Sequence, residues 1–569
     1  MRILGISTSH DSGAALIEDG RIISAINEER LQRIKLFWGI PKLAIKEVLR
    51  TSNTRPEDVD YVAICGILPS GGPSEFMCGT FTDTKRKRLF KTLSSTGITS
   101  TDIFKKTFRS VFRNFRKEKE LVIYLKELGI DVPMRFIEHH IAHAASAYYT
   151  CPYKDPIIVT TDSAGDALCS VVCTAENGEM VRRAESSFFH SPGEIYAYVT
   201  MNMGYRPARH EGKITGLAAY GKHKKTYPLF QKMISPDTKR LRYNSHIKCW
   251  GMSGARKVHA MTRGHKREDI AAGVQKMIEE VCSNIVCAAA EKYGKRAAAL
   301  AGGVFANVKL NQRIAENKNM DSVYIHPNMG DGGLAVGSAL KMWADLMVEQ
   351  GKVPKPFPID NVYFGPSFTE KEMEDALKRH KIKYSYHKDV EAEIANLIAK
   401  KKIVGRFNGR MEYGPRALGN RSILADPTDV TINDWLNKRL KRTEFMPFAP
   451  SIMREHADEY YKNFKNGEVA AQFMTITFDV TDRGVKTAPA VSHVDRTARP
   501  QTVTKEQNPS YYSILKEYKK LTGMPIFVNT SFNMHEEPIV CTPDDAIRAF
   551  QGGSVDILAM GNFIAQPRT

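Results

Sequence analysis

Short apolar runs alternate with polar or glycine-rich turns and with longer amphipathic stretches along most of the chain. Residues 2–6 and 14–17 are apolar and β-compatible, and the Asp19–Gly20 pair predicts a two-residue turn into a third strand at residues 21–26. Residues 270–293 carry the periodicity of a long amphipathic helix. Strands that alternate with helices in this way predict an α/β fold.

Two features of the pattern bear on domain organisation. Residues 351–360 (GKVPKPFPID) hold three prolines in ten positions, which predicts a boundary between domains. We therefore expect a larger N-terminal domain, residues 1–355, and a smaller C-terminal domain, residues 356–569, again of mixed helix and strand. The sequence shows no internal repeat of fixed period.

Composition excludes several classes of protein. The 569 residues have a mean hydropathy of −0.34, and no apolar run approaches the ~20 residues of a membrane span. The first residues lack the apolar core of a signal peptide. The nine cysteines form no CxxC pair, which favours reduced thiols over a disulfide framework. We therefore expect a cytoplasmic protein without a membrane span.

The positive charge is concentrated in two segments. Lysine and arginine number 82 against 63 acidic residues, a net charge of +19. Residues 85–119 carry a net +10 and residues 222–267 a net +12, so the rest of the chain is slightly acidic. The second segment also contains aromatic residues such as Trp250, which can stack on bases. These segments predict contact with a polyanion such as DNA, and a solvated cationic surface is the simpler alternative.

A predicted helix presents two histidines at metal-binding spacing. His139 and His143 are four residues apart, so both imidazoles project from one face. HExxH zinc proteases share this spacing, but His140 stands where the catalytic glutamate would be. Asp162 and Asp331 each follow a predicted strand, where an α/β fold presents ligands. Two histidines and two carboxylates suit Fe²⁺, Mn²⁺ or Zn²⁺, although surface histidines and turn aspartates look the same in a sequence.

Two glycine-punctuated segments suit phosphate or nucleotide. Gly302 and Gly303 follow a strand and lead towards Asn307, and a glycine turn there lets the backbone approach a nucleotide closely. Lys213 lies in the second such segment, poised for phosphate. A tight turn and a solvated lysine are the simpler interpretations.

The C-terminal part contains arginines in loops shaped by glycine and proline. Arg410, Arg416 and Arg421 fall in GRMEYGPRALGNRS, and their guanidinium groups predict a clamp for phosphate or carboxyphosphate. The same pocket is predicted to include polar residues of later loops, namely Lys441, Arg499, Asn529 and Ser531. Surface salt bridges would explain one such loop, but several in one domain favour a phosphate pocket.

Together these motifs resemble the O-carbamoyltransferase family of antibiotic and nodulation-factor carbamoyltransferases. The resemblance runs from Ile3 to Phe550, nearly the whole chain. Its most specific parts are GRMEYGPRALGNRSILADP, FMPFAPSI, TARPQTV and NTSFNMHEEPIVCTPDDAIRAF, and EHHIAHAASAYY, EGKITGLAAYG and AGGVFANVKLNQRI add to them. Four such motifs in the same order argue against a chance match.

The resemblance implies two catalytic domains and a reaction in two steps. The N-terminal domain resembles the tRNA threonylcarbamoyladenosine transferase, an actin/Hsp70-like (ASKHA) fold with a metal. The C-terminal domain resembles threonylcarbamoyladenylate synthase. Carbamoyl phosphate and ATP, with Mg²⁺, would form carbamoyladenylate in the C-terminal domain. An acceptor hydroxyl would then attack the carbamoyl carbon in the N-terminal domain.

The family likeness also assigns roles to residues. It places the metal, with Fe²⁺ as the first candidate, on His139, His143, Asp162 and Asp331. It implies that Lys441 and Arg416 neutralise phosphate charge. His10, in the first loop, would take the proton of the acceptor or else only donate a hydrogen bond to phosphate. Met446 departs from the pattern, because some members have arginine there and another residue must then supply that charge.

The family does not fix the acceptor, since its members modify antibiotics, sugars and lipo-oligosaccharides. The two basic segments lead us to expect a hydroxyl on a polyanion, in its sharpest form a hydroxymethylated pyrimidine in DNA. The alternatives are the same chemistry on a small molecule or glycan, and a non-catalytic nucleic-acid-binding protein on this scaffold. A symmetric homodimer is the default expectation for assembly.

Overall fold

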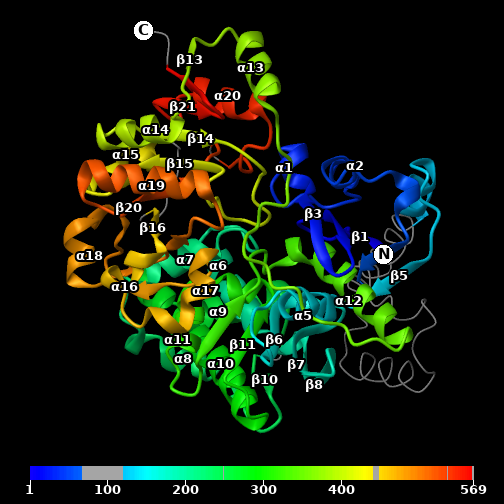
Figure 1. The fold of residues 1–569 in the computed structure, drawn as a ribbon. Helices are drawn as coiled ribbons and strands as arrows, with labels where there is room; N and C mark the ends of the chain where they lie inside the picture. Colours follow the sequence, from blue (N-terminus) through cyan, green and yellow to red (C-terminus); the bar gives the residue numbers. More distant parts are fainter. Residues whose placement is uncertain (67–118, 248, 440–447, 535, 567–569) are drawn as a thin grey trace.

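The structure, a computed structural model, describes residues 1–66, 119–247, 249–439, 448–534 and 536–566 (Figure 1). The predicted site residue Lys441 and the departure at Met446 lie outside these ranges, as does all of the basic segment 85–119 except Lys119. No helix within the described ranges has both the length and the apolar content needed to cross a membrane. The eight cysteines found there all have free thiols.

Two five-stranded sheets with the same strand order form the N-terminal part. In each sheet the first three strands make an antiparallel meander, and the last two run parallel to the first. The order is β3-β2-β1-β4-β5 in one sheet and β12-β11-β6-β7-β8 in the other, which is the same order read from the opposite end. The strands are β1 (Arg2–Ser7), β2 (Gly13–Glu18), β3 (Arg21–Asn27), β4 (Tyr61–Cys65), β5 (Met134–Ile137), β6 (Ile157–Gly165), β7 (Leu168–Glu176), β8 (Glu179–Ser187), β11 (Ala297–Ala301) and β12 (Ser322–Ile325).

This duplicated topology is the arrangement of the actin/Hsp70 class, so the predicted α/β class and the N-terminal fold are confirmed. The sequence did not reveal the repeat, because the repeat resides in strand order and hydrogen-bonding direction. Alternating buried positions satisfy that pattern with many different side chains, so no repeated motif is required.

Two helices lie between the sheets, and each packs against the sheet that it does not directly follow in the chain. Helix α5 (His139–Tyr149) follows the last strand of the first sheet and packs against the second sheet, whereas α12 (Leu334–Glu349) follows the second sheet and packs against the first (Figure 1). The crossing is close because small residues form it. A Cβ at Gly337 of α12 would overlap the carbonyl oxygen of Ala142 in α5.

We expect Gly337→Ala to destabilise the protein and to disturb α5, which carries His139 and His143. Alanine gains up to about 1 kcal/mol of helix propensity, but overpacking of a tight contact costs roughly 1–3 kcal/mol or more. A lower urea midpoint would show the destabilisation. Gly212→Ala is the matched control, because a Cβ at Gly212 meets nothing within 4 Å, and it should leave the midpoint unchanged or raise it.

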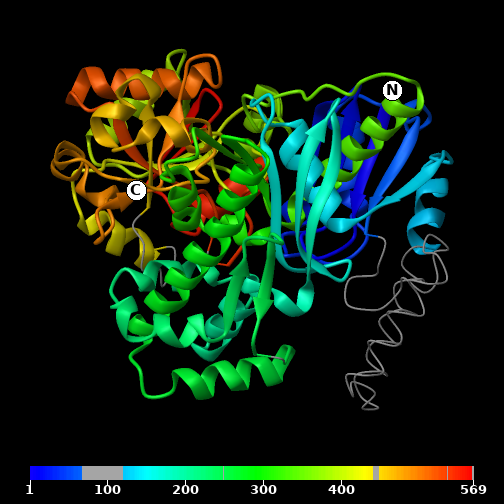
Figure 2. The ribbon, with the colours of Figure 1, turned by 90° about the horizontal axis from the view of Figure 1, so that it is seen from below.

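An eight-stranded mixed sheet forms the C-terminal part, separate from the other two sheets (Figure 2). Its strands, in spatial order, are β13 (Tyr384–Tyr386), β22 (Phe563–Ala565), β21 (Ile557–Met560), β14 (Val404–Phe407), β15 (Arg421–Ala425), β20 (Ile526–Ser531), β16 (Ala449–Met453) and β19 (Gln501–Val503). Helices α14 (Val390–Ala399) and α19 (Pro509–Thr522) pack on one another and bury apolar side chains such as Ile394 and Tyr518 against this sheet.

The remaining elements complete the layers around the three sheets. The other helices are α1 (Glu28–Gln32), α2 (Lys42–Thr51), α6 (Pro192–Asn202), α7 (Glu211–Ala218), α8 (Tyr227–Gln231), α9 (Gly251–Thr262), α10 (Arg267–Lys292), α11 (Val308–Ala315), α13 (Glu370–Arg379), α15 (Thr431–Arg439), α16 (Ala457–Tyr460), α17 (Glu468–Gln472), α18 (Asp482–Thr487) and α20 (Pro543–Gln551). Two short strand pairs are β9 (Ile234–Asp237) with β10 (Arg242–Ser245) and β17 (Phe478–Asp479) with β18 (Thr497–Ala498). The predicted helix 270–293 thus begins three residues earlier.

Polar contacts join the C-terminal part to the N-terminal part. Lys309 of α11 pairs with Asp495 at 2.9 Å, and the Asn311 amide donates to the carbonyl oxygen of Thr475 at 2.7 Å. Arg33, after α1, donates to the carbonyl oxygens of Pro538 and Ile539, both at 2.7 Å. These contacts fasten α11 and the residue after α1 to loops of the C-terminal part.

Candidate active site

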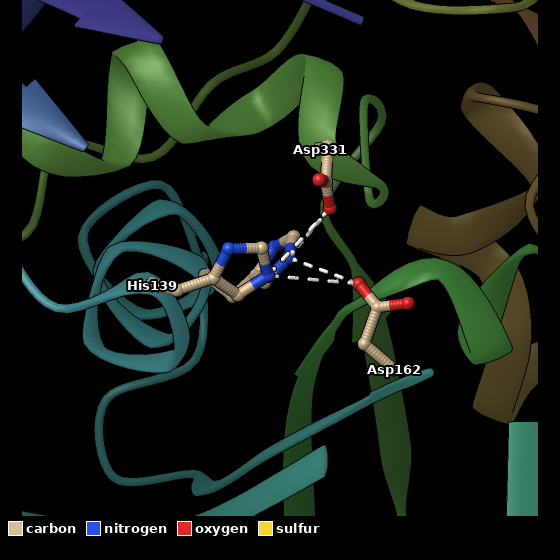
Figure 3. A group of neighbouring side chains, drawn as sticks. His139, Asp162 and Asp331 are labelled. Atoms are coloured by element: carbon tan, nitrogen blue, oxygen red, sulfur yellow. Dashed lines mark ion pairs between the residues drawn. The ribbon is translucent and has the colours of Figure 1, made fainter. Parts of the chain in front are cut away.

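Four predicted metal ligands converge between the two N-terminal sheets. His139 and His143 project from α5. Figure 3 shows His139 facing Asp162, near the end of β6, and Asp331, which follows β12. The Nε2 atom of His143 lies 3.3 Å from Asp162 Oδ2 and 3.5 Å from Asp331 Oδ1. The Nε2 atom of His139 lies 3.8 and 3.6 Å from the same two oxygens. The helix spacing and the strand-end positions therefore place all four ligands together.

The arrangement of these atoms fits a divalent metal. Among the described residues, the Nε2 atoms of His139 and His143 are buried and have no hydrogen-bond partner, which is costly unless a ligand satisfies them. Four tetrahedral ligands about 2.1 Å from a Zn²⁺ ion would lie about 3.4 Å apart, close to the observed separations. Burial alone would raise the pKa of Asp162, but the two histidines outweigh it and lower that pKa well below its usual range. The carboxylate is therefore ionised, as a metal ligand must be.

The residues next to the ligands have distinct roles. His10, in the turn after β1, places Nε2 3.2 Å from Asp331 Oδ2, and the charge of that carboxylate raises the pKa of His10 to about 10. His140 turns away from the group, and its Nδ1 lies 2.9 Å from Thr160 Oγ1. Burial, and then the charges of His139 and His143, lower the pKa of His140 well below its usual value. His140 is therefore a neutral core residue.

The predicted glycine turn packs directly against the strand that carries Asp162. Gly302 has φ +101°, and a Cβ there would overlap the backbone of Thr161. A Cβ at Gly303 would lie 3.0 Å from Asp162 Oδ1. Asn307 caps α11 by accepting from Leu310 and exchanges hydrogen bonds with the Gln275 amide. The glycines are thus required by the close packing of this loop on β6.

A second site is a pocket of about 350 Å³ between α7 and the C-terminal sheet. It brings together predicted residues from both parts of the chain, namely Lys213, Arg416, Arg499, Asn529 and Ser531. Lys35 and Arg209 also line it, and the sequence motifs did not single them out. Glu536 is the carboxylate of the lining, and its Oε2 lies 3.3 Å from Arg209. With five cationic side chains the pocket suits a polyphosphate or another anion.

Arg416 is the arginine of its loop that faces the pocket, so the prediction of a three-arginine clamp is wrong. Arg410 donates instead to the carbonyl oxygens of Ile23 and Phe364, at 2.9 and 2.8 Å. Arg421 is fully buried and donates to the carbonyl oxygen of Asn408 at 2.6 Å. Both arginines satisfy backbone oxygens that the loop would otherwise bury unpaired. Burial, and then the charge of Arg499, lower the pKa of Arg416 well below its usual value.

Glu412 organises the loop that carries Arg416, a role that the sequence did not indicate. Its buried Oε1 accepts from the backbone N–H groups of Leu418, Asn420 and Arg421, at 2.8, 2.8 and 3.1 Å. Three hydrogen bonds to one carboxylate hold a sharply turned backbone in place. In the sequence, an acidic residue between two glycines does not by itself predict this role, which becomes evident only from the structure of the turn.

The comparisons with known proteins agree over both parts of the chain. The family model for the carbamoyltransferase N-terminus matches residues 2–340, and the one for the carbamoyltransferase C-terminus matches residues 395–566. The chain belongs to the carbamoyltransferase family. Carbamoyl transfer is therefore the activity class of the enzyme, as the motifs predicted.

Relatives of this carbamoyltransferase are similar over nearly its full length. An uncharacterized protein of Synechocystis sp. is 32% identical, covering 100% of this chain and 97% of the relative. Nodulation protein NolNO of Sinorhizobium fredii is 30% identical, covering 98% of this chain and 79% of the relative. Among solved structures, component A of Acidaminococcus fermentans (R)-2-hydroxyglutaryl-CoA dehydratase is 14% identical, with a TM-score of 0.33 over 61% of this chain and 98% of that chain. A likeness that remote carries no argument about activity.

Proposed function

We propose that the carbamoyltransferase uses ATP and carbamoyl phosphate and transfers the carbamoyl group to a hydroxyl oxygen. Activation is assigned to residues 356–569 and transfer to residues 1–355. The observation that carries the proposal is that one chain combines a cationic pocket with a separate group of converging His and Asp ligands. The first suits phosphate chemistry and the second suits a cation that activates a carbonyl.

The activation step needs charge neutralisation around phosphate. Water first cleaves carbamoyl phosphate into carbamate and phosphate. A carbamate oxygen then attacks the α-phosphorus of ATP, and pyrophosphate leaves. Arg416, Arg499 and Lys213 would bind the phosphate oxygens and offset the charge that develops on pyrophosphate. Asn529 and Ser531 offer hydrogen bonds on the same wall. Lys441 is proposed to join them, and Mg²⁺ to accompany ATP.

The transfer step joins the acceptor oxygen to the carbamoyl carbon, and the bond from that carbon to the adenylate oxygen breaks as AMP leaves. His10 is assigned the proton of the acceptor. Because Asp331 raises the pKa of His10 to about 10, this role requires that a cation held by Asp331 offset the charge of that carboxylate and lower the pKa of His10 again. The adenylate is placed against the loop of Gly302, Gly303 and Asn307, because the close packing of this loop on β6 brings its backbone next to Asp162. A cation held by His139, His143, Asp162 and Asp331, with Fe²⁺, Mn²⁺ and Zn²⁺ as candidates, would polarise a carbonyl and stabilise charge on oxygen.

The acceptor is proposed to be a hydroxymethylated pyrimidine in DNA. Support comes from the cationic residues of segment 222–267, which are exposed on β10, on α9 and around the start of α10, as at Arg242, Arg256, Lys257 and Lys266. The alternative is a sugar or antibiotic hydroxyl, as for the family's known acceptors. That alternative leaves the exposed cations without a role in the reaction.

The test is to incubate the protein with ATP, Mg²⁺, Fe²⁺ and ¹⁴C-carbamoyl phosphate. Plain DNA, hydroxymethylcytosine DNA, hydroxymethyluracil DNA and a panel of sugars and aminoglycosides are offered in parallel. We expect label in hydroxymethylated DNA and none in plain DNA. Label in small molecules alone would move the acceptor to the alternative, and no label with no ATP consumption would refute the proposal.

A further inference from the structure

An exposed aromatic patch lies beside the loop that carries Asp162, outside both sites described above. We call Phe188, Phe189, Trp250 and Met252 the aromatic shelf. The rings of Phe188 and Trp250 meet edge to face, with centroids 5.5 Å apart. Phe189, Trp250 and Met252 are 43%, 45% and 60% exposed. Large apolar side chains grouped at a surface indicate a binding face.

Backbone and hydroxyl hydrogen bonds tie the shelf to the loop of the metal ligand. The N–H of Phe188 donates to the carbonyl oxygen of Ala167, at the turn that follows β6. Ser191, three residues after Phe188, donates its hydroxyl to the carbonyl oxygen of Asp162 at 2.9 Å. Hydrogen bonds therefore link the shelf directly to the segment that carries Asp162.

A second chain of contacts reaches the other side of the shelf. Burial raises the pKa of Glu194 in α6, and the nearby side chains of Tyr198 and Ser163 offset part of that rise. The Tyr198 hydroxyl accepts from the N–H of Gly251 at 2.9 Å, immediately after Trp250. Contacts therefore run from Ser163, next to Asp162, through Glu194 and Tyr198 to the backbone beside Trp250. The shelf and the loop that carries Asp162 thus form one packed unit.

Positive charge borders the shelf. Strand β10 runs along the end of β8, where the N–H of Tyr243 donates to Ser186 Oγ at 3.1 Å and that of Ser245 to His190 Nδ1 at 3.0 Å. Arg242 starts this strand and is exposed. Lys257 of α9 folds back to donate to the carbonyl oxygen of Ile247 at 2.8 Å. Aromatic rings flanked by cations are the combination that binds single-stranded nucleic acid.

We propose that the aromatic shelf seats the base of a nucleic-acid acceptor, with phosphates on the Arg242 and Lys257 side of the shelf. The inference rests on the proposed function, since it supplies that reaction with an acceptor subsite. A base stacked on Trp250 or Phe189 would lie next to the Asp162–Ser163 loop, where its hydroxymethyl group can reach the transfer site. A duplex substrate would have to present the base unstacked.

The binding test uses a single-stranded hydroxymethyluracil oligonucleotide at low salt and follows tryptophan fluorescence. We expect saturable quenching that Trp250→Phe abolishes with little loss of affinity, since phenylalanine still stacks. Trp250→Ala should weaken binding about 10-fold or more. Trp435→Phe is the matched control, because Trp435 is also exposed, at 38%, but lies in α15 of the C-terminal part, and it should keep the quenching.

Kinetics separate this inference from the proposed function. Trp250→Ala should raise the KM for the oligonucleotide at least 10-fold and leave carbamoyl-phosphate-dependent ATP–pyrophosphate exchange unchanged. If Trp250→Ala and wild type have equal affinity and equal KM for the oligonucleotide, the proposal that the shelf binds a base is overturned. Quenching by a methyl glucoside but not by the oligonucleotide would overturn it as well. Absence of the exchange in the wild type would instead count against the proposed function, while the binding test still decides the shelf.

Discussion

Asp162→Asn is expected to lower carbamoyl transfer about 10³-fold while leaving the formation of carbamoyladenylate within about twofold of wild type. Asparagine keeps the size of the side chain but removes the charge that faces His143 at 3.3 Å and His139 at 3.8 Å. A metal that activates a carbonyl contributes several kcal/mol to the transition state, and about 4 kcal/mol corresponds to 10³ in rate. Because the cationic pocket proposed for activation lies between α7 and the C-terminal sheet, away from Asp162, its chemistry should persist.

Two assays on the same Asp162→Asn preparation decide this expectation. ATP–pyrophosphate exchange dependent on carbamoyl phosphate reports activation, and ¹⁴C label in the acceptor reports transfer. Bound metal should fall in parallel with transfer, and a chelator should reproduce the loss in the wild type. Asp131→Asn, at an exposed aspartate paired with Lys126, is the control. Full transfer by a metal-depleted Asp162→Asn protein would remove the His/Asp group from the mechanism.

Arg416→Met should reduce ATP–pyrophosphate exchange about 10²–10³-fold without destabilising the protein. Preorganised cations at a developing negative charge are worth that much in rate. Within the described ranges no carboxylate is paired with Arg416, and its pKa is lowered by burial and by Arg499. Methionine would fill similar space and remove the repulsion between the two guanidinium groups. The melting temperature should therefore stay the same or rise.

The contrast between activity and stability makes the Arg416→Met test specific. Arg296→Met, which removes an exposed arginine paired with Asp321 at 2.6 Å, should leave both the exchange and the melting temperature nearly unchanged. A fall in the melting temperature of Arg416→Met would mean that Arg416 supports the fold. Unchanged exchange would mean that the pocket binds another anion.

The convergence of the His/Asp group could be predicted from the sequence because local geometry determines it. His139 and His143 share a helix face whatever surrounds the helix. Asp162 lies near the end of β6 and Asp331 follows β12, and these two strands run parallel in one sheet. The individual roles of the arginines could not be predicted in this way. Arg416 and Arg421 share one loop, but Arg421 meets backbone carbonyls at 2.6 and 2.9 Å and Arg416 lines the pocket.

That difference depends on tertiary packing, which a motif does not encode. The loop turns because Glu412 binds three of its N–H groups, and the turn sends Arg421 inwards and Arg416 outwards. The duplicated sheet was invisible for a related reason, since strand order is a property of pairing between distant segments. Lys35 and Arg209 were missed because they reach the pocket from segments outside any phosphate-like motif.

If the carbamoyltransferase activates its substrate as an adenylate, the phosphorus products of the reaction reveal it. Wild-type protein is incubated with ATP, carbamoyl phosphate, Mg²⁺, Fe²⁺ and hydroxymethyluracil DNA, and ³¹P NMR follows the phosphates. We expect AMP, pyrophosphate and phosphate in equal amounts, with one carbamoyl ester formed for each AMP. Carbamoyl transfer accompanied by ADP, or without any consumption of ATP, would rule out an adenylate.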